Sequence, residues 1–484
     1  MVRLLLATAT VVAGVSSEPV GGADRADAGG RRREGPMSSP TPRQIEPFTG
    51  ARGDFTGVWY ACGTANTLPG RKYVYGGGKA TYSAWHRPMA VYAAAVDKTF
   101  FVFGDARNRP NISTYDHKTG TFADPVVLGT NIDGNAHRNP TILIDEGGTV
   151  FVFRGYNGMP THVVRSARPH DITRWLPRTP VETGGKASYP QPWELKAGEI
   201  LVSYRQSPGW SYRISKDGAQ SWAPTVNLVR FEGCMIYAVT VAETGPYPRK
   251  VHIAWSRLGG GTDEEQRTKH LWARRYNVHY ACSPDGGRTW QRSDGQPYKL
   301  PIDEASAEKL YDCGQRGVWL KDIQLDSKGS PSILFVDAEV ATFRSTWKLA
   351  RRSAGAWQVA DVATSDHMYD GGAMVILADD DMRIYAPTTP SQPGYDGGEI
   401  EEWRSVDGGL TWKNTAHLTT GSTYSHNHVK PVLHHERGRG DLRVLWAYGD
   451  STYPPATRRV SLYCYGERMG KPRCIRRVRA DAGP

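Results

Sequence analysis

The sequence predicts an all-β protein, a β-propeller with seven blades, from three observations. The 484 residues include 53 glycines, 32 prolines, 15 tryptophans and 24 tyrosines but only 23% charged side chains, a composition typical of turn-rich sheet proteins. Runs rich in Val, Ile, Phe, Tyr and Trp recur about every fifty to seventy residues, the length of one four-stranded blade. The third observation is a turn motif that repeats along the chain.

The turn motif S-x-D-G-x-x-x-W occurs in three complete copies, at Ser215–Trp222, Ser283–Trp290 and Ser405–Trp412. The aspartate accepts backbone N–H bonds, the glycine adopts positive φ and the indole anchors the turn on the sheet. We call it the Asp-box turn and expect it on the outer rim, with a structural role. Six aromatic residues close a complete or degenerate copy and mark six blades: Phe122, Trp175, Trp222, Trp290, Trp357 and Trp412.

The remaining strands are expected to complete the ring. The seventh blade should combine residues from His428 to about Cys464 with an N-terminal strand near Gly57–Tyr60, because closure removes free sheet edges. A two-domain sandwich is the competing architecture, but its strands lack this period. The recurring β-type runs are Val91–Phe103, Thr149–Arg154, Ile200–Arg205, Val251–Ser256, Ser332–Val336, Met382–Ala386 and Leu442–Ala447.

The N-terminus predicts secretion. Residues 1–20 contain Arg3, an apolar run from Leu4 to Val15 and then small residues, as a signal peptide does. Residues 21–50, rich in Gly, Ala, Arg, Ser and Pro, are an expected disordered leader. Residues 51–484 are then one propeller. No later stretch has eighteen consecutive apolar residues, so we expect a soluble mature protein with no membrane partner, and a monomer.

The charge and the cysteine content restrict the partners that the protein is expected to bind. The net charge of +11 and the pI of about 9.2 suit a polyanionic partner. The chain has no basic helix, zinc-finger spacing or RNP-like strand, which argues against nucleic acid. The six cysteines show no metal-ligand spacing, and Cys464 and Cys474 are close enough to form a disulfide in an oxidising compartment.

The chemistry is expected in loops that feed the inner strands. His137, Arg138 and Asn139 stand directly before Pro140 and the expected strand Thr141–Ile144. Histidine suits general acid or base work because its pKa lies near neutrality. The alternative for His137 is a structural histidine bonded to backbone.

A second segment contributes an aromatic ring and a cation to the candidate site. Tyr189 is followed by Pro190, and Arg205 ends the next strand, where its planar fork suits a carboxylate. Trp210 and Tyr212 follow and offer a stacking face for a sugar; the alternative is that both are core residues.

Two more segments, Ser365–Gly372 and Tyr424–His428, hold further candidates for substrate binding: His367, Tyr369 and His426. His426 and His428, two positions apart, should point to the same side of a strand, so a metal pair is conceivable although no third ligand is evident. Whether a structural metal ion is bound stays open at this point.

On these stretches the chain resembles the BNR-4 repeat proteins, a propeller family that includes ulvan lyases. The resemblance runs from about residue 85 to 450. The stretches that carry it are Asn135–Gly158, Tyr189–Arg205, Gly317–Asp322, Ser365–Gly372 and Gly397–Glu399.

The resemblance implies a secreted lyase that cleaves an acidic, uronate-containing, ulvan-like polysaccharide by β-elimination. His137 matches the family's first histidine, Tyr189 its tyrosine, and Arg205 the arginine sixteen residues later. The second histidine is replaced by Asn157, which binds but does not exchange a proton. Tyr189 must then act as base, acid or both, with His137 and Arg205 on the carboxylate. This chemistry requires no cofactor.

Two alternatives remain open. A glycoside hydrolase, rhamnosidase-like or sialidase-like, would use the same pocket, although the chain lacks the F-R-I-P motif that sialidases carry. A carbohydrate-binding propeller without catalysis is favoured by Asn157.

Overall fold

A computed structural model describes ten stretches of the chain. Every described residue lies in one compact unit, within Ile45–Pro484. The predicted signal peptide, the leader, the Gly57–Tyr60 strand and Asn157 all lie outside the described residues. The described residues are 79–105, 109–130, 136–156, 159–184, 187–245, 247–259, 275–339, 342–435, 441–451 and 460–475.

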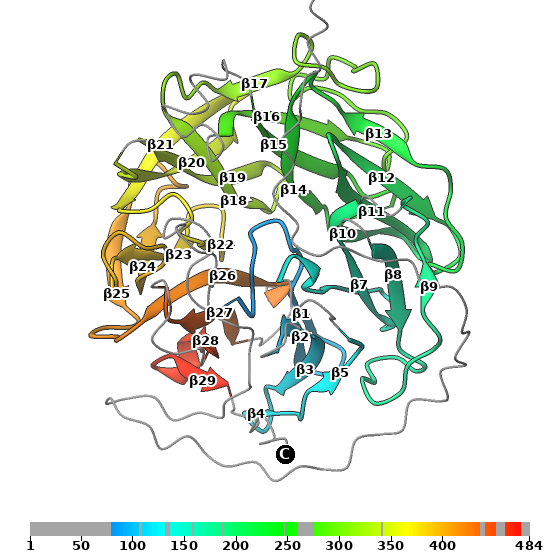
Figure 1. The fold of residues 1–484 in the computed structure, drawn as a ribbon, viewed down its shortest axis with the longest axis horizontal. Helices are drawn as coiled ribbons and strands as arrows, with labels where there is room; N and C mark the ends of the chain where they lie inside the picture. The colour runs from blue at the N-terminus through cyan, green and yellow to red at the C-terminus, as the bar shows by residue number, and fades with distance from the viewer. Residues whose placement is uncertain are drawn as a thin grey trace, which may run out of the picture. The chain divides into compact units, whose positions relative to one another are not determined.

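The described residues form an all-β structure (Figure 1). Strands and short 3-10 turns such as η1 (Ala136–Arg138) and η4 (Glu467–Met469) account for its regular structure, and none of its helices is long and apolar enough to cross a membrane. Neighbouring strands within each sheet run antiparallel, with one exception described below. The strands group into five four-stranded sheets and one nine-stranded sheet.

The five four-stranded sheets follow one another in sequence. The first two consist of β6 (Thr141–Ile144), β7 (Val150–Tyr156), β8 (Met159–Arg165) and β9 (Thr179–Pro180), then β10 (Ala187–Lys196), β11 (Glu199–Gln206), β12 (Gly209–Ser215) and β13 (Val226–Val229). The other three consist of β14 (Met235–Ala242), β15 (Val251–Leu258), β16 (Arg275–Ser283) and β17 (Glu308–Tyr311); β18 (Gly317–Leu325), β19 (Pro331–Ala338), β20 (Ser345–Ser353) and β21 (Ala356–Ser365); and β22 (Ala373–Ile376), β23 (Met382–Thr389), β24 (Glu399–Ser405) and β25 (Lys413–His417).

The nine-stranded sheet joins the two ends of the described chain. Its order is β29-β28-β27-β26-β1-β2-β3-β4, with β5 also on β3, and the joint is a parallel pairing of β1 with β26 through Ala90 and Val432. The C-terminal β29 supplies the fourth strand beside β28, so the strands extend beyond the predicted end of this blade near Cys464. The strands are β1 (Ala90–Ala93), β2 (Lys98–Gly104), β3 (Pro110–Asp116), β4 (Thr121–Phe122), β5 (Val126–Val127), β26 (Ser425–Leu433), β27 (Leu442–Gly449), β28 (Val460–Gly466) and β29 (Arg473–Ile475).

The predicted β-type runs fall on β2, β7, β11, β15, β19, β23 and β27, each the second strand of its group. These strands are paired on both sides and buried on both faces, which explains why they are the most apolar runs of the sequence. One boundary was wrong: Val91–Phe103 is a hairpin, because β1 ends at Ala93 and β2 starts at Lys98.

The Asp-box turns are confirmed as structural turns between a third and a fourth strand. In the β16–β17 connection, the amides of Arg288 and Thr289 donate to Asp285 Oδ1 at 3.0 and 2.8 Å. The amide of Gly287 donates to Ser283 Oγ at 2.7 Å. The same bonds recur around Asp217 and Asp407. Their positions place these turns at one end of the sheets, away from the strand ends that begin β6, β10 and β18.

The predicted disulfide between Cys464 and Cys474 is wrong, since no disulfide bond joins these two cysteines. Cys464 pairs opposite Arg473, and Cys474 pairs opposite Tyr463. The two side chains are therefore offset by one residue and point to opposite faces of the sheet, into different hydrophobic clusters.

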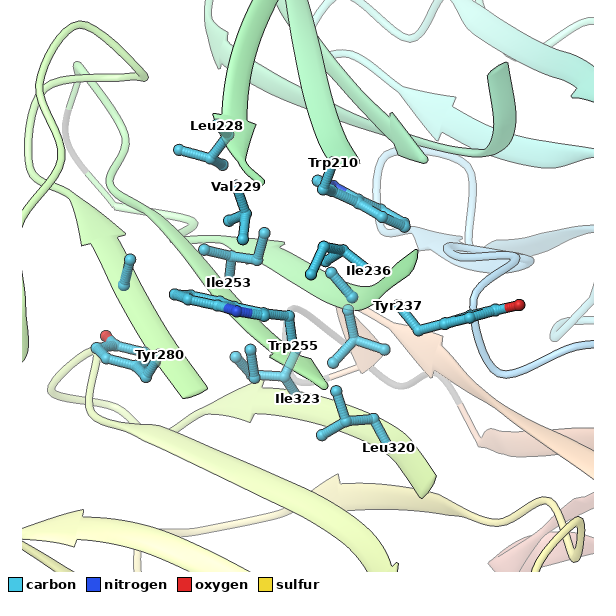
Figure 2. Packing of buried hydrophobic residues seen from close by; sticks show 14 of the residues in the cluster. Trp210, Leu228, Val229, Ile236, Tyr237, Ile253, Trp255, Tyr280, Leu320 and Ile323 are labelled. Atoms are coloured by element: carbon cyan, nitrogen blue, oxygen red, sulfur yellow. The ribbon is translucent and has the colours of Figure 1, made fainter. Parts of the chain in front are cut away.

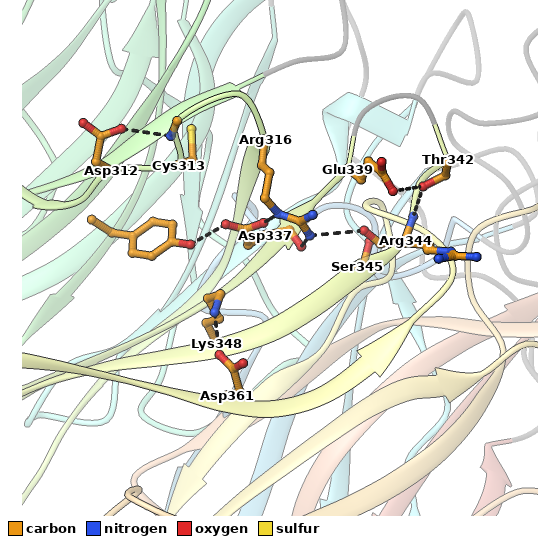
Figure 3. Close-up of polar contacts among 12 residues, drawn as sticks. Asp312, Cys313, Arg316, Asp337, Glu339, Thr342, Arg344, Ser345, Lys348 and Asp361 are labelled. Carbon is orange, nitrogen blue, oxygen red and sulfur yellow. Dashed lines mark hydrogen bonds and ion pairs between the residues drawn. The ribbon is translucent and has the colours of Figure 1, made fainter.

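The core lies between and within the sheets. Figure 2 shows part of the largest cluster, where Trp210 and Trp255 pack with aliphatic side chains such as Ile236 and Ile323. Buried charge is compensated: the carboxylate of Asp337, 1% exposed, accepts hydrogen bonds from Arg316 and from the Tyr311 hydroxyl (Figure 3). That pair links β19 to the chain just before β18.

Candidate active site

The three predicted catalytic residues lie together, at the end of the sheets opposite the Asp-box turns. The ring centroids of His137 and Tyr189 are 6.0 Å apart, and Arg205 Cζ lies 4.9 Å from the Tyr189 ring centroid. His137 is half-buried, whereas Tyr189 and Arg205 are 1% and 5% exposed. We define the central cluster as these three and their aromatic and basic neighbours Tyr82, Trp85, His86, Tyr237 and Arg275.

Tyr189 reaches the cluster through a bulge in β10. The register of β10 on β11 shifts between Ser188 and Gln191, and Tyr189 has φ of 60°. This left-handed conformation costs a non-glycine residue about 1–3 kcal/mol and occurs preferentially at functional sites. Pro190 needs no ladder partner because it has no N–H, and its carbonyl accepts a 2.8 Å bond from the Thr141 hydroxyl. The bulge thus places the Tyr189 ring among the rings of His86, Trp85 and His137.

Two other first strands are bulged where they enter the same region. The register of β18 shifts at Lys321, and that of β26 shifts between Asn427 and Lys430, with His428 at φ of 58°. The ring of His428 lies 5.2 Å from that of Tyr82. Bulges re-aim side chains, and here they turn a lysine and a histidine toward the centre.

The segment 79–89, directly before β1, enters the cluster and fixes two histidines. The Tyr82 hydroxyl lies 3.1 Å from His137 Nε2. His86 Nδ1 accepts the Ser83 amide at 2.9 Å, so His86 Nε2 carries the proton and donates it to the His137 carbonyl at 3.0 Å. His86 is therefore a neutral, positioning residue.

Three sheets hold this segment in place. Arg87 forms a buried 2.7 Å ion pair with Asp322 of β18. Lys430 of β26 donates to the carbonyls of Ser83 and His86. From β10, Gln191 donates to the Trp85 carbonyl at 3.0 Å.

The electrostatics keep His137 neutral. Burial lowers its pKa well below the ordinary value, and the nearby His86, Arg205 and Lys79 lower it further. A neutral imidazole at neutral pH can accept a proton, which a base must do.

The surroundings carry more positive than negative groups. Burial lowers the pKa of Lys321 and of Lys430 to about 7 and that of Lys79 to about 8, while burial raises the pKa of Asp370 well above its usual range. Among the described residues the cations here include Lys79, Arg87, Arg205, Arg275, Lys321 and Lys430, and the carboxylates include Asp322, Asp366, Asp370 and Asp396. An anionic ligand is favoured in such a site.

Arg275 connects the cluster to two predicted binding residues. Its Cζ lies 4.3 Å from the Tyr237 ring and 4.9 Å from the Trp85 ring, and its guanidinium donates to the Tyr369 hydroxyl at 3.3 Å. His367 lies next to Tyr369, with ring centroids 5.9 Å apart and Nδ1 accepting the Tyr369 amide at 3.1 Å. The two residues border the cluster, and their contact with substrate stays a prediction.

His426 does not join the cluster. Its Nδ1 accepts the Trp446 indole N–H at 2.9 Å and its Nε2 lies 3.0 Å from the Ser422 hydroxyl, so both ring nitrogens are engaged within its own sheet. The prediction that His426 and His428 face the same side is wrong, because the bulge in β26 lies between them and breaks the alternation. Among the residues that the structure describes, no three His, Cys, Asp or Glu side chains form a group that could hold a metal.

Three further predicted binding residues have structural roles. Asn139 is fully buried, and its amide donates to the carbonyls of Lys79 and Tyr82 at 2.8 and 2.9 Å, so it holds the segment 79–89. Trp210 lies across from Arg205 in the sheet, but its indole is fully buried in the hydrophobic cluster of Figure 2. The Tyr212 hydroxyl donates to the Gly287 carbonyl at 2.5 Å on an Asp-box turn.

The structure assigns no role to the other two predicted binding residues, Arg138 and Asn157. Arg138 is buried on η1, and its role stays a prediction. Asn157, the residue at the expected place of a second histidine, lies outside the described residues.

The sequence did not indicate the segment 79–89, Tyr237 or Arg275 as parts of the site, and it indicated His428 only as a conceivable metal ligand beside His426. One signal was present: His86-Arg87-Pro88 before β1 repeats the pattern of His137, Arg138 and Pro140 before β6. Arg275 carries no such signal, because it opens a third strand and reaches the centre only through the packing of β16 against β18.

The chain is similar in sequence to known proteins. One curated relative is Ulvan Lyase-PL25 of Pseudoalteromonas sp. (strain PLSV), which is 23% identical over 378 residues; the match covers 66% of this chain and 74% of the relative. Another is Ulvan lyase of Alteromonas sp. (strain LOR), which is 23% identical over 292 residues; the match covers 51% of this chain and 58% of the relative. The chain thus spans less than two thirds of the second relative.

Solved structures share the fold. A PL25 ulvan lyase bound to -[GlcA(1-4)Rha3S]- superposes with a TM-score of 0.67 at 16% identity, covering 87% of this chain and 97% of that one. The polysaccharide lyase Uly1 superposes with a TM-score of 0.57 at 13% identity, covering 85% and 97%. A family model for BNR repeat-containing proteins matches residues 81–365, more than half of the chain. The protein therefore belongs to the BNR repeat-containing family.

Proposed function

We propose that the protein is a secreted polysaccharide lyase that cleaves an acidic, uronate-containing, ulvan-like polysaccharide by β-elimination. The observation that carries the proposal is the convergence of His137, Tyr189 and Arg205, with ring centroids 6.0 Å apart and the guanidinium 4.9 Å from the phenol ring. The ulvan lyases among the relatives support the substrate class.

The reaction needs three tasks. A cation must bind the uronate carboxylate, so that the proton on the adjacent carbon becomes acidic. A base must remove that proton, and an acid must protonate the departing glycosidic oxygen. The electron pair of the broken C–H bond forms the new carbon–carbon double bond as the C–O bond breaks.

The central cluster supplies groups for each task. Arg205 binds the carboxylate with its planar fork, and the neutral His137 contributes to the same binding. Tyr189, held by the β10 bulge, acts from its deprotonated form: the phenolate oxygen removes the proton, and the resulting phenol donates it to the leaving oxygen, which restores the phenolate. His137 is the most exposed of the three, so we expect the polymer to approach from its side. No metal is required, because Arg205 supplies the positive charge.

The excess of buried cations around the cluster supports an anionic substrate. Burial is the main cause of the lowered pKa values of Lys79, Lys321 and Lys430, so an additional anion nearby would favour their charged forms. A uronate polymer supplies that anion.

We also propose that the fold is a seven-bladed propeller. The first strands contact one another in the order β1, β6, β10, β14, β18, β22 and β26, and β26 pairs with β1. Splitting the nine-stranded sheet at this parallel joint gives two blades beside the five four-stranded sheets. Secretion is supported by Arg3 and the apolar run that follows it, and a monomer is expected.

The test is an assay on ulvan and other uronate polymers with purified protein. Elimination should raise the ultraviolet absorbance as unsaturated uronate ends form. New reducing ends without absorbance would instead identify a hydrolase. A folded protein that produces neither on any acidic polymer contradicts catalysis and leaves a binding protein, the alternative that Asn157 favours.

A further inference from the structure

A cavity of about 440 Å³ lies between the β14–β17 and β18–β21 sheets, at the end that carries the Asp-box turns. None of its lining residues belongs to the central cluster. We infer that it is an accessory binding site for an anionic saccharide, a segment of the same uronate-bearing polymer. The identity of that polymer rests on the proposed function; binding in the cavity does not require turnover.

The cavity lies where the β20–β21 connection has no Asp-box turn. Each complete turn that can be compared packs on the preceding sheet: a β-carbon added at Gly287 would lie 3.0 Å from Leu201 Cδ1, and one at Gly409 would lie 2.6 Å from Leu349 Cδ2. The β20–β21 connection has only a two-residue turn, Ala354-Gly355, between the paired Ser353 and Ala356. This short turn does not reach across the gap toward the β14–β17 sheet, and the described residues leave a cavity there.

The lining of this cavity is mainly basic. Lys250, Lys328, Arg351 and Arg352 contribute positive charge, against the carboxylates Asp326 and Asp379. Arg351 pairs with Asp326 at 3.1 Å, and Lys250 pairs with Glu243 outside the lining at 3.4 Å.

Two of these cations have no carboxylate within ion-pair distance among the described residues. Arg352 donates to the carbonyls of Gly355 and Ser293 at 2.7 and 2.6 Å, so its described partners are neutral groups. The exposed Lys328 uses only its backbone amide, on Asp326. In addition, Arg351 Nε is buried without a hydrogen-bond partner. The cavity therefore offers charge and donors to an incoming carboxylate or sulfate.

The remaining lining suits a sugar. Hydroxyl groups come from Ser293, Ser330 and Ser353, and Pro284 and Pro331 add apolar surface for ring C–H groups. The volume falls within the range of about 300–1,000 Å³ typical of small-molecule sites, enough for a mono- or disaccharide unit. A polymer that binds both here and at the central cluster gains effective concentration at the second site.

The test counts binding events by calorimetry, with a sulfated uronate oligosaccharide as the probe and Tyr189→Phe protein to prevent turnover. We expect two events. Lys328→Glu should weaken one of them about tenfold, and because Lys328 is exposed the variant should fold normally. Arg352→Gln should weaken the same event. The matched control is Arg288→Gln, since Arg288 stands on a complete Asp-box turn and pairs with Glu199; both events should persist.

Each outcome of these titrations either supports or overturns the accessory site. Two events that survive both Lys328→Glu and Arg352→Gln, or a single event that Arg205→Gln alone removes, overturn the accessory site. Inorganic sulfate that binds the cavity as tightly as the oligosaccharide overturns the saccharide assignment. Two events with the expected variant pattern, in a protein that forms no unsaturated product, uphold the accessory site while the proposed lyase activity fails.

Discussion

Removal of one oxygen atom from Tyr189 separates catalysis from structure. In Tyr189→Phe the ring keeps its neighbours: Trp85 at 5.5 Å, His86 at 5.1 Å and the Arg205 guanidinium at 4.9 Å. Only hydrogen bonding of the hydroxyl is lost, which is worth about 0.5–1.5 kcal/mol. For a folded unit of this size the melting temperature should then fall by no more than about 2 °C.

The effect on turnover should be far larger. If the phenol exchanges the proton in the transition state, kcat should fall by about 100-fold to 10,000-fold, or about 2.7–5.4 kcal/mol. The assay is the rate of absorbance rise on an acidic polymer at several concentrations, so that kcat and KM are separated. KM should change little, because Arg205 and His137 still bind the carboxylate.

The matched control is Tyr212→Phe. This variant also loses a buried hydroxyl, one that donates to the Gly287 carbonyl at 2.5 Å on the opposite end of the sheets. Its kcat should equal that of the unmodified protein, with a loss of about 1 kcal/mol in stability. A Tyr189→Phe enzyme whose kcat lies within threefold of the unmodified value refutes the assignment of Tyr189 as base or acid.

The remaining predictions concern two arginines and one histidine. Arg205→Lys keeps the charge but loses the planar fork, so kcat/KM on acidic polymers should fall about tenfold or more; a change under twofold contradicts the carboxylate role. Arg87→Met leaves Asp322 buried without its cation and should cost about 3 kcal/mol in urea unfolding; a cost below about 1 kcal/mol would show that the pair does not hold the segment 79–89. Burial lowers the pKa of His426 to about 3, so the stability that this neutral side chain contributes is present above the unfolded-state pKa of about 6.5 and is lost as the pH falls. In His426→Gln the decline in unfolding free energy between pH 6.5 and 5.5 should therefore be smaller by about 1 kcal/mol. Equal declines in the two proteins contradict this prediction.

Features encoded locally were predictable from the sequence. The Asp-box turn is specified within eight residues, because the Asp285 carboxylate accepts hydrogen bonds from the amides three and four residues later. The spacing of its copies along the chain predicted the length of the repeating unit. The apolar runs located the central strands for the same reason: a strand buried on both faces needs no polar alternation.

Predictions failed where a side chain's direction depends on a register. One extra residue in a strand reverses the face to which side chains point. The bulge in β26 separates His426 from His428, and a one-residue offset sends Cys464 and Cys474 to opposite faces. Trp210 is a core residue for a related reason, since only packing decides which aromatic rings near a strand end stay exposed.

The sequence by itself determined the all-β architecture, the repeat, and the residue types His137, Tyr189 and Arg205 as the chemical groups to examine. Only the tertiary structure decided that these three meet, and which groups surround them. Tyr189, Arg275 and His428 come from three different sheets, with the segment 79–89 between them. Contacts between residues so far apart in the sequence depend on how the strands close around a common centre and on bulges in the first strands. Neither feature can be predicted from a single local stretch of residues.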